Sequence, residues 1–185
     1  MRAVQRALGT RIHPAALDAV HFNREPTFRF NAPAREYGVL YVSERAEGAF
    51  AETLLGRRKR PPLVSLEVLR GLAISRLMWP RPLRLADFCG FGLGWLGLDG
   101  RIAADDAYEL ARRWSVWVHG HPACVDGIVY YARNAPSIRT AALFEDRAGA
   151  PRISEVLENQ LVDSRGRAGA MLLHLVRTFK VGLVR

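Results

Sequence analysis

Short apolar runs bounded by turn residues predict a chain rich in strands. The run GVLYVS at 38–43 is typical of a buried strand, because it is apolar, short and enriched in β-branched residues. The same pattern predicts strands at 62–69, 72–79, 126–133 and 139–146, a short strand or extended entry at 9–13, and a short strand or turn at 81–88. Several of these follow one another without a full helix between them. This order predicts an α+β fold rather than a regular doubly wound sheet.

Apolar residues at helical spacing predict helices at 43–55 and 103–121, with one or two helical turns at 14–20. The tail at 166–184 fits either a helix ending near 179 or a strand, and the helix is preferred. Ser43 is the expected N-cap of the first helix. Glu52 falls beside the apolar face of this helix, one turn after Gly48. Because glycine has no side chain, we expect open space beside the Glu52 carboxylate.

Composition predicts one globular domain over residues 1–185. Of the 185 residues, 49% are hydrophobic and 24% are charged, which is ordinary for a folded protein of this length. The N-terminal stretch MRAVQRALGTRIHPAA lacks the apolar core of a signal peptide, and no apolar run is long enough to span a bilayer. We therefore expect a cytoplasmic protein without membrane contact. Cys89 and Cys124 are expected to be free thiols.

A net charge of +9 favours a polyanionic partner, such as nucleic acid, nucleotide phosphates or an acidic protein. The one dense basic run, GRRKRPP at 56–62, follows a predicted helix and is interpreted as its solvated end. The basic residues form no stripe interleaved with aromatics. Direct binding of nucleic acid is therefore not expected.

Two motif matches are interpreted as structural. GLGWLG at 92–97 fits the G-x-G-x-x-G dinucleotide fingerprint, but it lacks the following helix and the downstream acidic residue that this motif requires. We expect instead a glycine-rich loop around a buried Trp95. His119 and His121 lie at a predicted helix C-terminus, near Cys124. No second cluster completes a tetrahedral site, so no metal is expected.

The stretch FRFNAPAREYGVLYVSERAEGAFAE at 28–52 contains the candidate chemistry. Arg29, flanked by phenylalanines, could present its fork of donors to a phosphate. Tyr41 could stack on a flat ring, and Glu52 could steady a developing oxocarbenium ion. A surface arginine, a core tyrosine and a helix-edge glutamate are equally ordinary. The residues alone leave both interpretations open.

Three segments together resemble the RES family, toxins of toxin–antitoxin modules. Besides the stretch RFNAPAREYGVLYVSERAEGAFAE, TRIHP resembles the family's N-terminal arginine strand, and VDGIVYYARNAPSIRTAALFED resembles its C-terminal strand block. The resemblance covers roughly residues 9–146. It leaves a C-terminal extension at 147–185.

The resemblance implies a fold related to the ADP-ribosyltransferase toxins, with mixed central sheets, flanking helices and a cleft for NAD+. It implies a toxin that degrades NAD+ as its substrate, by hydrolysis or phosphorolysis of the nicotinamide–ribose bond, without a prosthetic group. By motif, Arg11 and Arg29 would hold the phosphates or ribose of NAD+. Tyr41 would pack on the nicotinamide side, and Glu52 would be the catalytic carboxylate.

The implied partner is an Xre-like helix-turn-helix antitoxin that blocks the cleft in an oligomeric complex. The chain departs from the family at the NAD+-binding position Ala132, because YYAR replaces the family's Y-x-S-R. This departure keeps two alternatives open: transfer of ADP-ribose to a protein, or a weakened module that binds NAD+ or the antitoxin. An RNA-directed toxin is a third hypothesis from another class.

Overall fold

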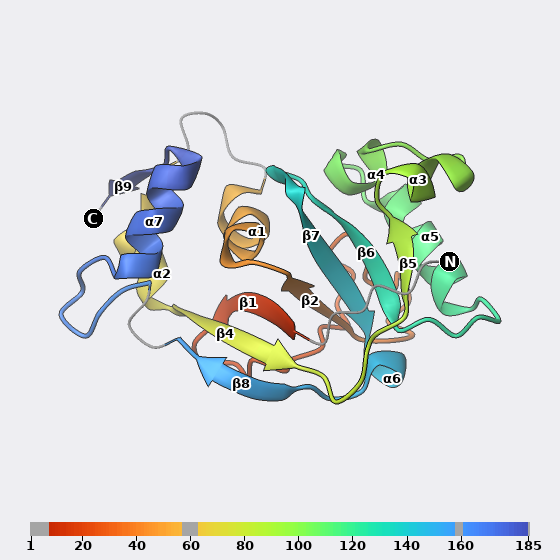
Figure 1. The fold of residues 1–185 in the computed structure, drawn as a ribbon, viewed down its shortest axis with the longest axis horizontal. Coiled ribbons are helices and arrows are strands. Elements are labelled where there is room, and N and C mark those ends of the chain that lie inside the picture. Colours follow the sequence, from red (N-terminus) through yellow and green to blue (C-terminus); the bar gives the residue numbers. More distant parts are fainter. Residues whose placement is uncertain (1–7, 57–62, 158–160, 185) are drawn as a thin grey trace.

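A mixed sheet of seven strands crosses the molecule, and helices cover both of its ends (Figure 1). The computed structural model describes residues 8–56, 63–157 and 161–184. The sheet contains β1 (Leu8–Pro14), β2 (Val39–Ser43), β4 (Leu72–Met78), β5 (Leu85–Phe88), β6 (Gly127–Ala132), β7 (Ala135–Phe144) and β8 (Arg152–Val156). Its spatial order is β5-β6-β7-β2-β1-β4-β8. β5 and β6 are parallel and the other neighbours are antiparallel, which confirms the predicted α+β class.

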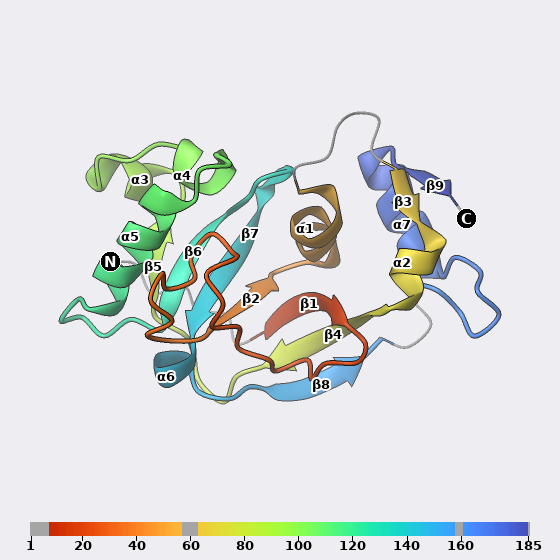
Figure 2. The ribbon, with the colours of Figure 1, turned by 180° about the vertical axis from the view of Figure 1, so that it is seen from behind.

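Apart from one short helix that follows β7, the helices gather in two groups on either side of a central one. They are α1 (Ala46–Phe50), the π-helical turn η1 (Ala51–Leu55), α2 (Leu66–Arg70), α3 (Phe91–Trp95), α4 (Arg101–Ala104), α5 (Glu109–His119), α6 (Glu145–Ala148) and α7 (Ala170–Phe179). At one end, α2 and α7 lie beside a small parallel pair, β3 (Leu63–Ser65) and β9 (Gly182–Val184) (Figure 2). At the other end lie α3, α4 and α5. Within the described ranges, no helix has the length and apolarity needed to cross a membrane.

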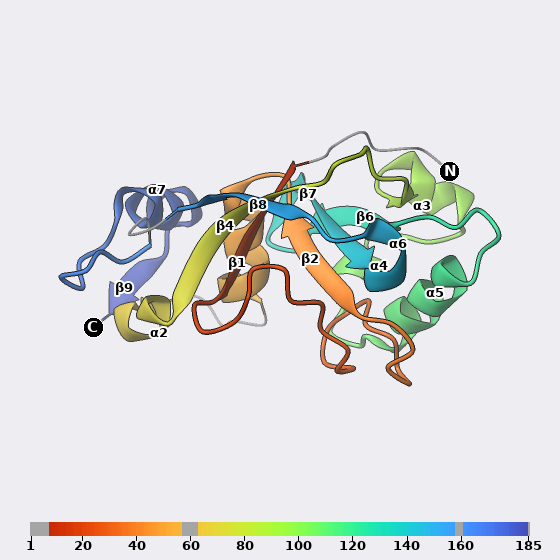
Figure 3. The ribbon, with the colours of Figure 1, turned by 90° about the horizontal axis from the view of Figure 1, so that it is seen from below.

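The two faces of the sheet bury different cores. Because side chains alternate along a strand, Val39 and Tyr41 of β2 face α5, whereas Leu40 and Val42 face the opposite side. On the helix side, one apolar cluster joins α1 and η1 to α7, and a second lies under α4 and α5. Figure 3 shows α7 and α5 at opposite ends of the sheet, with α1 between them.

The helix predicted at 43–55 begins later than expected and changes its winding. Ser43 stays in β2, where it pairs with Thr140 of β7 and its hydroxyl donates to the Arg139 carbonyl at 3.2 Å. The N-cap is Arg45, which has an extended backbone with φ −142°. The prediction of Ser43 as N-cap is therefore wrong, because pairing within the sheet takes precedence. From Ala51 the helix widens into a π-helical turn, a feature often found at functional sites.

The helix predicted at 103–121 is interrupted. The chain forms α4 and then an irregular loop before α5 begins at Glu109. In this loop the Asp105 carboxylate accepts from the main-chain N–H of Ala107 at 3.0 Å, a local turn that competes with helix. Arg29, distant in sequence, binds the Asp105 carbonyl and so removes it from helical bonding.

Two other predicted elements differ from the structure. Residues 15–20 form turns and bends rather than a helix, Pro14 ends β1, and Asp18 accepts a hydrogen bond from the main-chain N–H of Val20 at 2.8 Å. The strand expected at 62–69 is shorter, because Ser65 caps α2 by accepting from the Glu67 N–H. The basic run at 56–62 lies outside the described residues from 57 onward.

Gly48 is packed against the sheet, which contradicts the open space expected beside it. A Cβ added at this position would overlap the Ser43 hydroxyl and lie 2.7 Å from Ile138 Cγ2. Gly48 therefore allows α1 to approach β2 and β7 closely. That approach places η1, and with it Glu52, against the sheet.

We predict that Gly48→Ala destabilises the protein by about 1–3 kcal/mol, because the added methyl must push α1 away from Ser43 and Ile138. Urea unfolding measures this change. Gly94→Ala is the matched control, because Gly94 is also helical and no atom lies within 4 Å of its added Cβ. Equal stability of the two variants would contradict the prediction.

Candidate functional site

Glu52 is held at the end of β6 by one hydrogen bond to each carboxylate oxygen. The main-chain N–H of Arg133 donates to Oε1 at 2.8 Å, and the Tyr130 hydroxyl donates to Oε2 at 3.1 Å. The side chain is half-buried. These two donors, called the clamp on Glu52 from here on, fix the plane of the carboxylate before any ligand binds.

Burial raises the pKa of Glu52 above its ordinary value. The N–H of Arg133, the Tyr130 hydroxyl and the positive charge of Arg29 act in the opposite direction without cancelling the effect of burial. The carboxylate is therefore poorly solvated. A cation that forms beside it is stabilised more strongly than it would be in water.

The Tyr41 hydroxyl is saturated by the protein. It accepts from the main-chain N–H of Phe30 at 2.9 Å and donates to Asn31 Oδ1 at 2.9 Å. Burial raises the pKa of this phenol. The ring is partly exposed and lies 5.7 Å from the ring of Phe28. Tyr41 can therefore present a ring to a ligand, but its hydroxyl organises the loop that carries Arg29.

Arg29 is buried at 7% exposure and braces the loop between α4 and α5. Its Nη1 donates to the carbonyls of Asp105 at 2.7 Å and Ile102 at 3.3 Å. The guanidinium lies 4.5 Å from the centre of the Tyr108 ring, a cation–π contact. Arg29 therefore directs at least one of its N–H groups to main-chain carbonyls of the protein itself.

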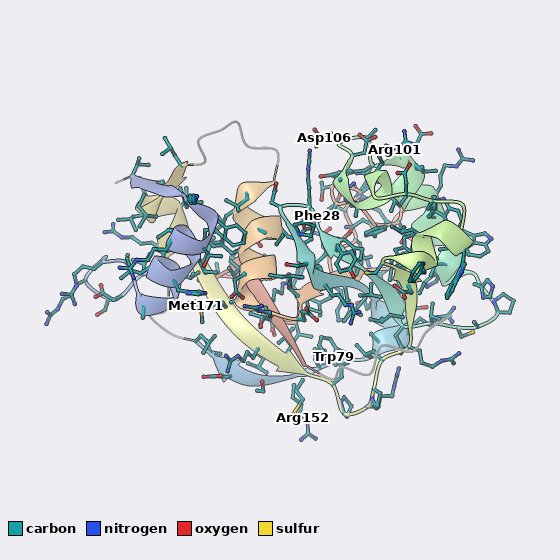
Figure 4. The ribbon with its side chains drawn as sticks, turned by 45° about the horizontal axis from the view of Figure 1, so that its top comes forward. Phe28, Trp79, Arg101, Asp106, Arg152 and Met171 are labelled. Atoms are coloured by element: carbon teal, nitrogen blue, oxygen red, sulfur yellow. The ribbon has the colours of Figure 1, made fainter. Side chains whose placement is uncertain are left out.

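The structure brings Arg29, Tyr41 and Glu52 into one region, where the charges of Glu52 and Arg29 both act on the pKa of the Tyr41 phenol. Figure 4 shows Phe28, which contacts Tyr41, on the same side of the molecule as Asp106 and away from Trp79. Tyr130 joins the region through its bond to Glu52.

Sequence reasoning missed the residues that position Glu52 and Tyr41. Tyr130 and Arg133 lie in the quoted segment YYAR, and Asn31 lies two residues after Arg29. The Tyr130 hydroxyl in a buried strand and the fully buried Asn31 side chain both need hydrogen-bond partners. This requirement was the signal in the sequence that could have identified them.

Arg11 does not join the other predicted residues. Its neighbour Ile12 packs on α1, so the alternation of β1 directs Arg11 to the opposite face of the sheet. There it donates to the carbonyls of Ala19 at 2.8 Å and His21 at 3.0 Å. Burial lowers the pKa of this guanidinium to about 10, against the opposing effect of Asp18.

Ala132 lies beside the clamp on Glu52, between Tyr130 and Arg133 in sequence. It is 1% exposed and packs in the apolar cluster with Ala49 and Ile138. The cluster places a methyl group where the resemblance expects a hydroxyl.

The histidine pair at 119 and 121 has structural partners. His119 stacks on Tyr37 with ring centres 4.0 Å apart and contacts Asp146 at 3.0 Å. His121 Nδ1 accepts from the N–H of Ala123 at 3.1 Å. Across the described part of the chain, no group of three or more His, Cys, Asp or Glu side chains could hold a metal ion.

The glycine-rich stretch at 92–97 differs from its prediction. Trp95 is 81% exposed rather than buried, because α3 is a single short turn at the surface. Phe91 on the same helix is also exposed.

A family model for the RES domain matches residues 3–163, most of the chain. The chain belongs to the RES domain family. The match extends beyond the 9–146 expected from the motifs. This RES domain also resembles a chain in the crystal structure of the M. tuberculosis MbcT–MbcA toxin–antitoxin complex. The TM-score is 0.63, with 16% identity over 84% of this chain and 85% of that one, which shows a shared fold. No curated protein sequence gives a match.

We predict that Glu52→Gln stabilises the fold at neutral pH. Since burial raises the pKa of Glu52 above 4.5 in the folded state, its ionisation costs stability as the pH rises from 4.5 through the folded pKa. The advantage of the glutamine variant should therefore be small below pH 4.5, grow as the pH rises through the folded pKa, and then stay constant. Urea unfolding at a series of pH values measures it.

Glu47→Gln on the neighbouring α1 is the control with the opposite sign. Burial acts upward on the pKa of Glu47, but bonds from its own N–H, Arg45 and His174 outweigh burial, so this pKa is lowered. Glu47→Gln should therefore lose stability relative to the native chain as the pH rises. The Glu52 prediction is wrong if both variants respond to pH in the same direction.

Proposed function

We propose that this RES domain is a toxin that cleaves the nicotinamide–ribose bond of NAD+. The observation that carries the proposal is the clamped, poorly solvated Glu52 carboxylate beside the buried Arg29 and the ring of Tyr41. Membership of the RES family supports it. We also propose that the fold belongs with the ADP-ribosyltransferase toxins.

The proposed reaction uses Glu52 to stabilise a ribosyl cation. The bond between the ribose C1′ and the nicotinamide nitrogen breaks heterolytically, and its electron pair leaves with neutral nicotinamide. Positive charge then develops on the ribose ring, where a fixed carboxylate in a low-dielectric site is most effective. Water adds to C1′ and loses a proton to solvent, or a phosphate oxygen adds to C1′, which completes hydrolysis or phosphorolysis.

The other residues are proposed to bind and orient the substrate. The Arg29 guanidinium suits an anionic or ribose oxygen, and the partly exposed Tyr41 ring suits the nicotinamide side. Arg11 lies on the opposite face of the sheet, so in this arrangement it supports the loop through Ala19 and His21.

We propose an antitoxin as partner, as in the MbcT–MbcA toxin–antitoxin complex that the fold resembles. A helix-turn-helix protein of Xre type that blocks access to Glu52 in an oligomeric, cytoplasmic complex remains our expectation. Phe91 and Trp95 on α3 and Trp117 on α5 are large, exposed apolar side chains, and partner proteins often cover side chains of this kind.

We further propose that residues 1–185 act as a single domain. Residues 170–179 lie beyond the family match, yet they pack on the helix that carries the site. Phe179 of α7 stacks on Phe50 of α1, with ring centres 5.6 Å apart, and Leu172 and Leu175 are fully buried in the same cluster.

Incubation of the purified protein with NAD+ should release nicotinamide, with water or added phosphate as acceptor. Glu52→Gln should reduce this rate about 100-fold or more while the protein stays folded, because the charge that stabilises the cation is lost. Glu47→Gln, which removes a nearby carboxylate outside the site, should keep the native rate. No nicotinamide from the native chain under either condition would contradict the proposal. Transfer of radiolabelled ADP-ribose to a protein would identify a different acceptor.

A second candidate, a module that binds NAD+ with little turnover, is favoured by one observation: Ala132 is buried among apolar side chains. If the family hydroxyl contacts the ligand, Ala132→Ser should raise kcat/KM for nicotinamide release about two- to ten-fold. Ala135→Ser, on the partner residue of the bulged β6–β7 pair, is the matched control. An unchanged or lower kcat/KM for a folded Ala132→Ser variant would show that the missing hydroxyl does not limit the reaction.

A further inference from the structure

Arg133 connects the site to the surface through two different groups. Its main-chain N–H binds Glu52 Oε1 at 2.8 Å, while its guanidinium forms an ion pair with Asp106 in the loop between α4 and α5. The Arg133 side chain is 26% exposed and that of Asp106 is 54% exposed. A cation adjacent to the clamped carboxylate is thus neutralised by a carboxylate of the protein itself.

The same loop also covers Arg29. The carbonyl of Asp105 accepts from the Arg29 guanidinium at 2.7 Å, and the Tyr108 ring lies over it. Residues 104–107 are exposed, whereas Ile102 and Ala103 before them are buried in the apolar core. The exposed part of the loop thus contacts two arginines of the region, Arg29 through Asp105 and Arg133 through Asp106.

We propose that Arg133 binds the diphosphate of the dinucleotide substrate and that Asp106 is its internal competitor, which occupies the guanidinium until the substrate displaces it. The proposal rests on the proposed function, because it assigns the substrate's diphosphate to the side of the site next to Glu52. It assigns roles to Arg133 and Asp106 that the family motif does not give them.

The exchange is favourable on general grounds. An exposed carboxylate–guanidinium pair is weak, because water and salt screen it and two side chains lose freedom. The planar guanidinium binds phosphate oxygens in pairs, and a diphosphate offers more charge than one carboxylate. A neutral nucleoside lacks the charge to displace Asp106. The ion pair would therefore also select ligands that carry a diphosphate.

The test is a double-mutant cycle on Asp106 and Arg133, with ADP binding followed by calorimetry and nicotinamide release from NAD+ followed in parallel. Asp106→Asn should tighten ADP binding and lower KM for NAD+ about two- to five-fold, with kcat unchanged, because the competitor loses its charge. Arg133→Met keeps the N–H that binds Glu52 but should weaken ADP binding. In the Arg133→Met background, Asp106→Asn should have no further effect.

Asp99→Asn is the matched control, because Asp99 also pairs with an arginine, Arg101, at the start of α4 and outside the site. An asparagine there can still accept the N–H of Arg101 that Asp99 Oδ1 accepts. The inference is overturned if Asp106→Asn changes ADP affinity and KM no more than Asp99→Asn does. It is also overturned if Asp106→Asn still tightens ADP binding in the Arg133→Met background, or if ADP binds none of the variants. If ADP binding follows the cycle but no nicotinamide is released, the inference stands and the proposed function fails.

Discussion

The two hydrogen bonds that join Glu52 to the end of β6 are the contact on which the site depends, and they require a helix seated directly on the sheet. Gly48 permits this close packing of the helix on the sheet, because any side chain there would clash with Ser43 and Ile138. The π-helical turn that follows determines which face of the helix presents its carboxylate to Tyr130 and the N–H of Arg133. On the other side of α1, the stacking of Phe179 on Phe50 opposes movement away from the sheet. The position of the Glu52 carboxylate thus depends on the packing of Gly48 and Phe50, residues to which no catalytic role is assigned.

This position has an electrostatic cost that the surrounding residues reduce but do not remove. Burial raises the pKa of Glu52, and Arg29, Tyr130 and the N–H of Arg133 only partly oppose it. A site that fully solvated its carboxylate would have less to offer a developing cation. The bonds of Tyr41 to Phe30 and Asn31 serve the same arrangement, since they hold the loop that keeps Arg29 within electrostatic reach of Glu52.

The sequence predicted local patterns well and long-range contacts poorly. The strands at 9–13, 38–43, 72–79, 126–133 and 139–146 and the helix ending near 179 are all present, because each is specified by its own apolar spacing. Gly48 was misinterpreted because its neighbours, Ser43 and Ile138, come from two strands whose register the local pattern does not reveal. The break at Asp105 depends on Arg29, 76 residues away in sequence.

Where the predicted site residues lie in the structure follows from the strands that carry them. The motif named Arg29, Tyr41 and Glu52 on neighbouring segments, and these come together because β2 leads directly into α1. Arg11 lies on another strand, where alternation decides the face, and its neighbour Ile12 takes the side of the helices.

The replacement at Ala132 affects the site less than the loss of a family residue suggests. Of the two donors to Glu52, one is the main-chain N–H of Arg133, which no side-chain substitution at 132 removes. The other is Tyr130, whose ring is fixed 5.0 Å from Phe30 in the core under α5. A serine at 132 could add a third polar contact, but neither existing donor depends on it. The clamp on Glu52 is therefore complete in the alanine chain, so any deficit in activity must arise in contacts with the ligand rather than in the position of the carboxylate.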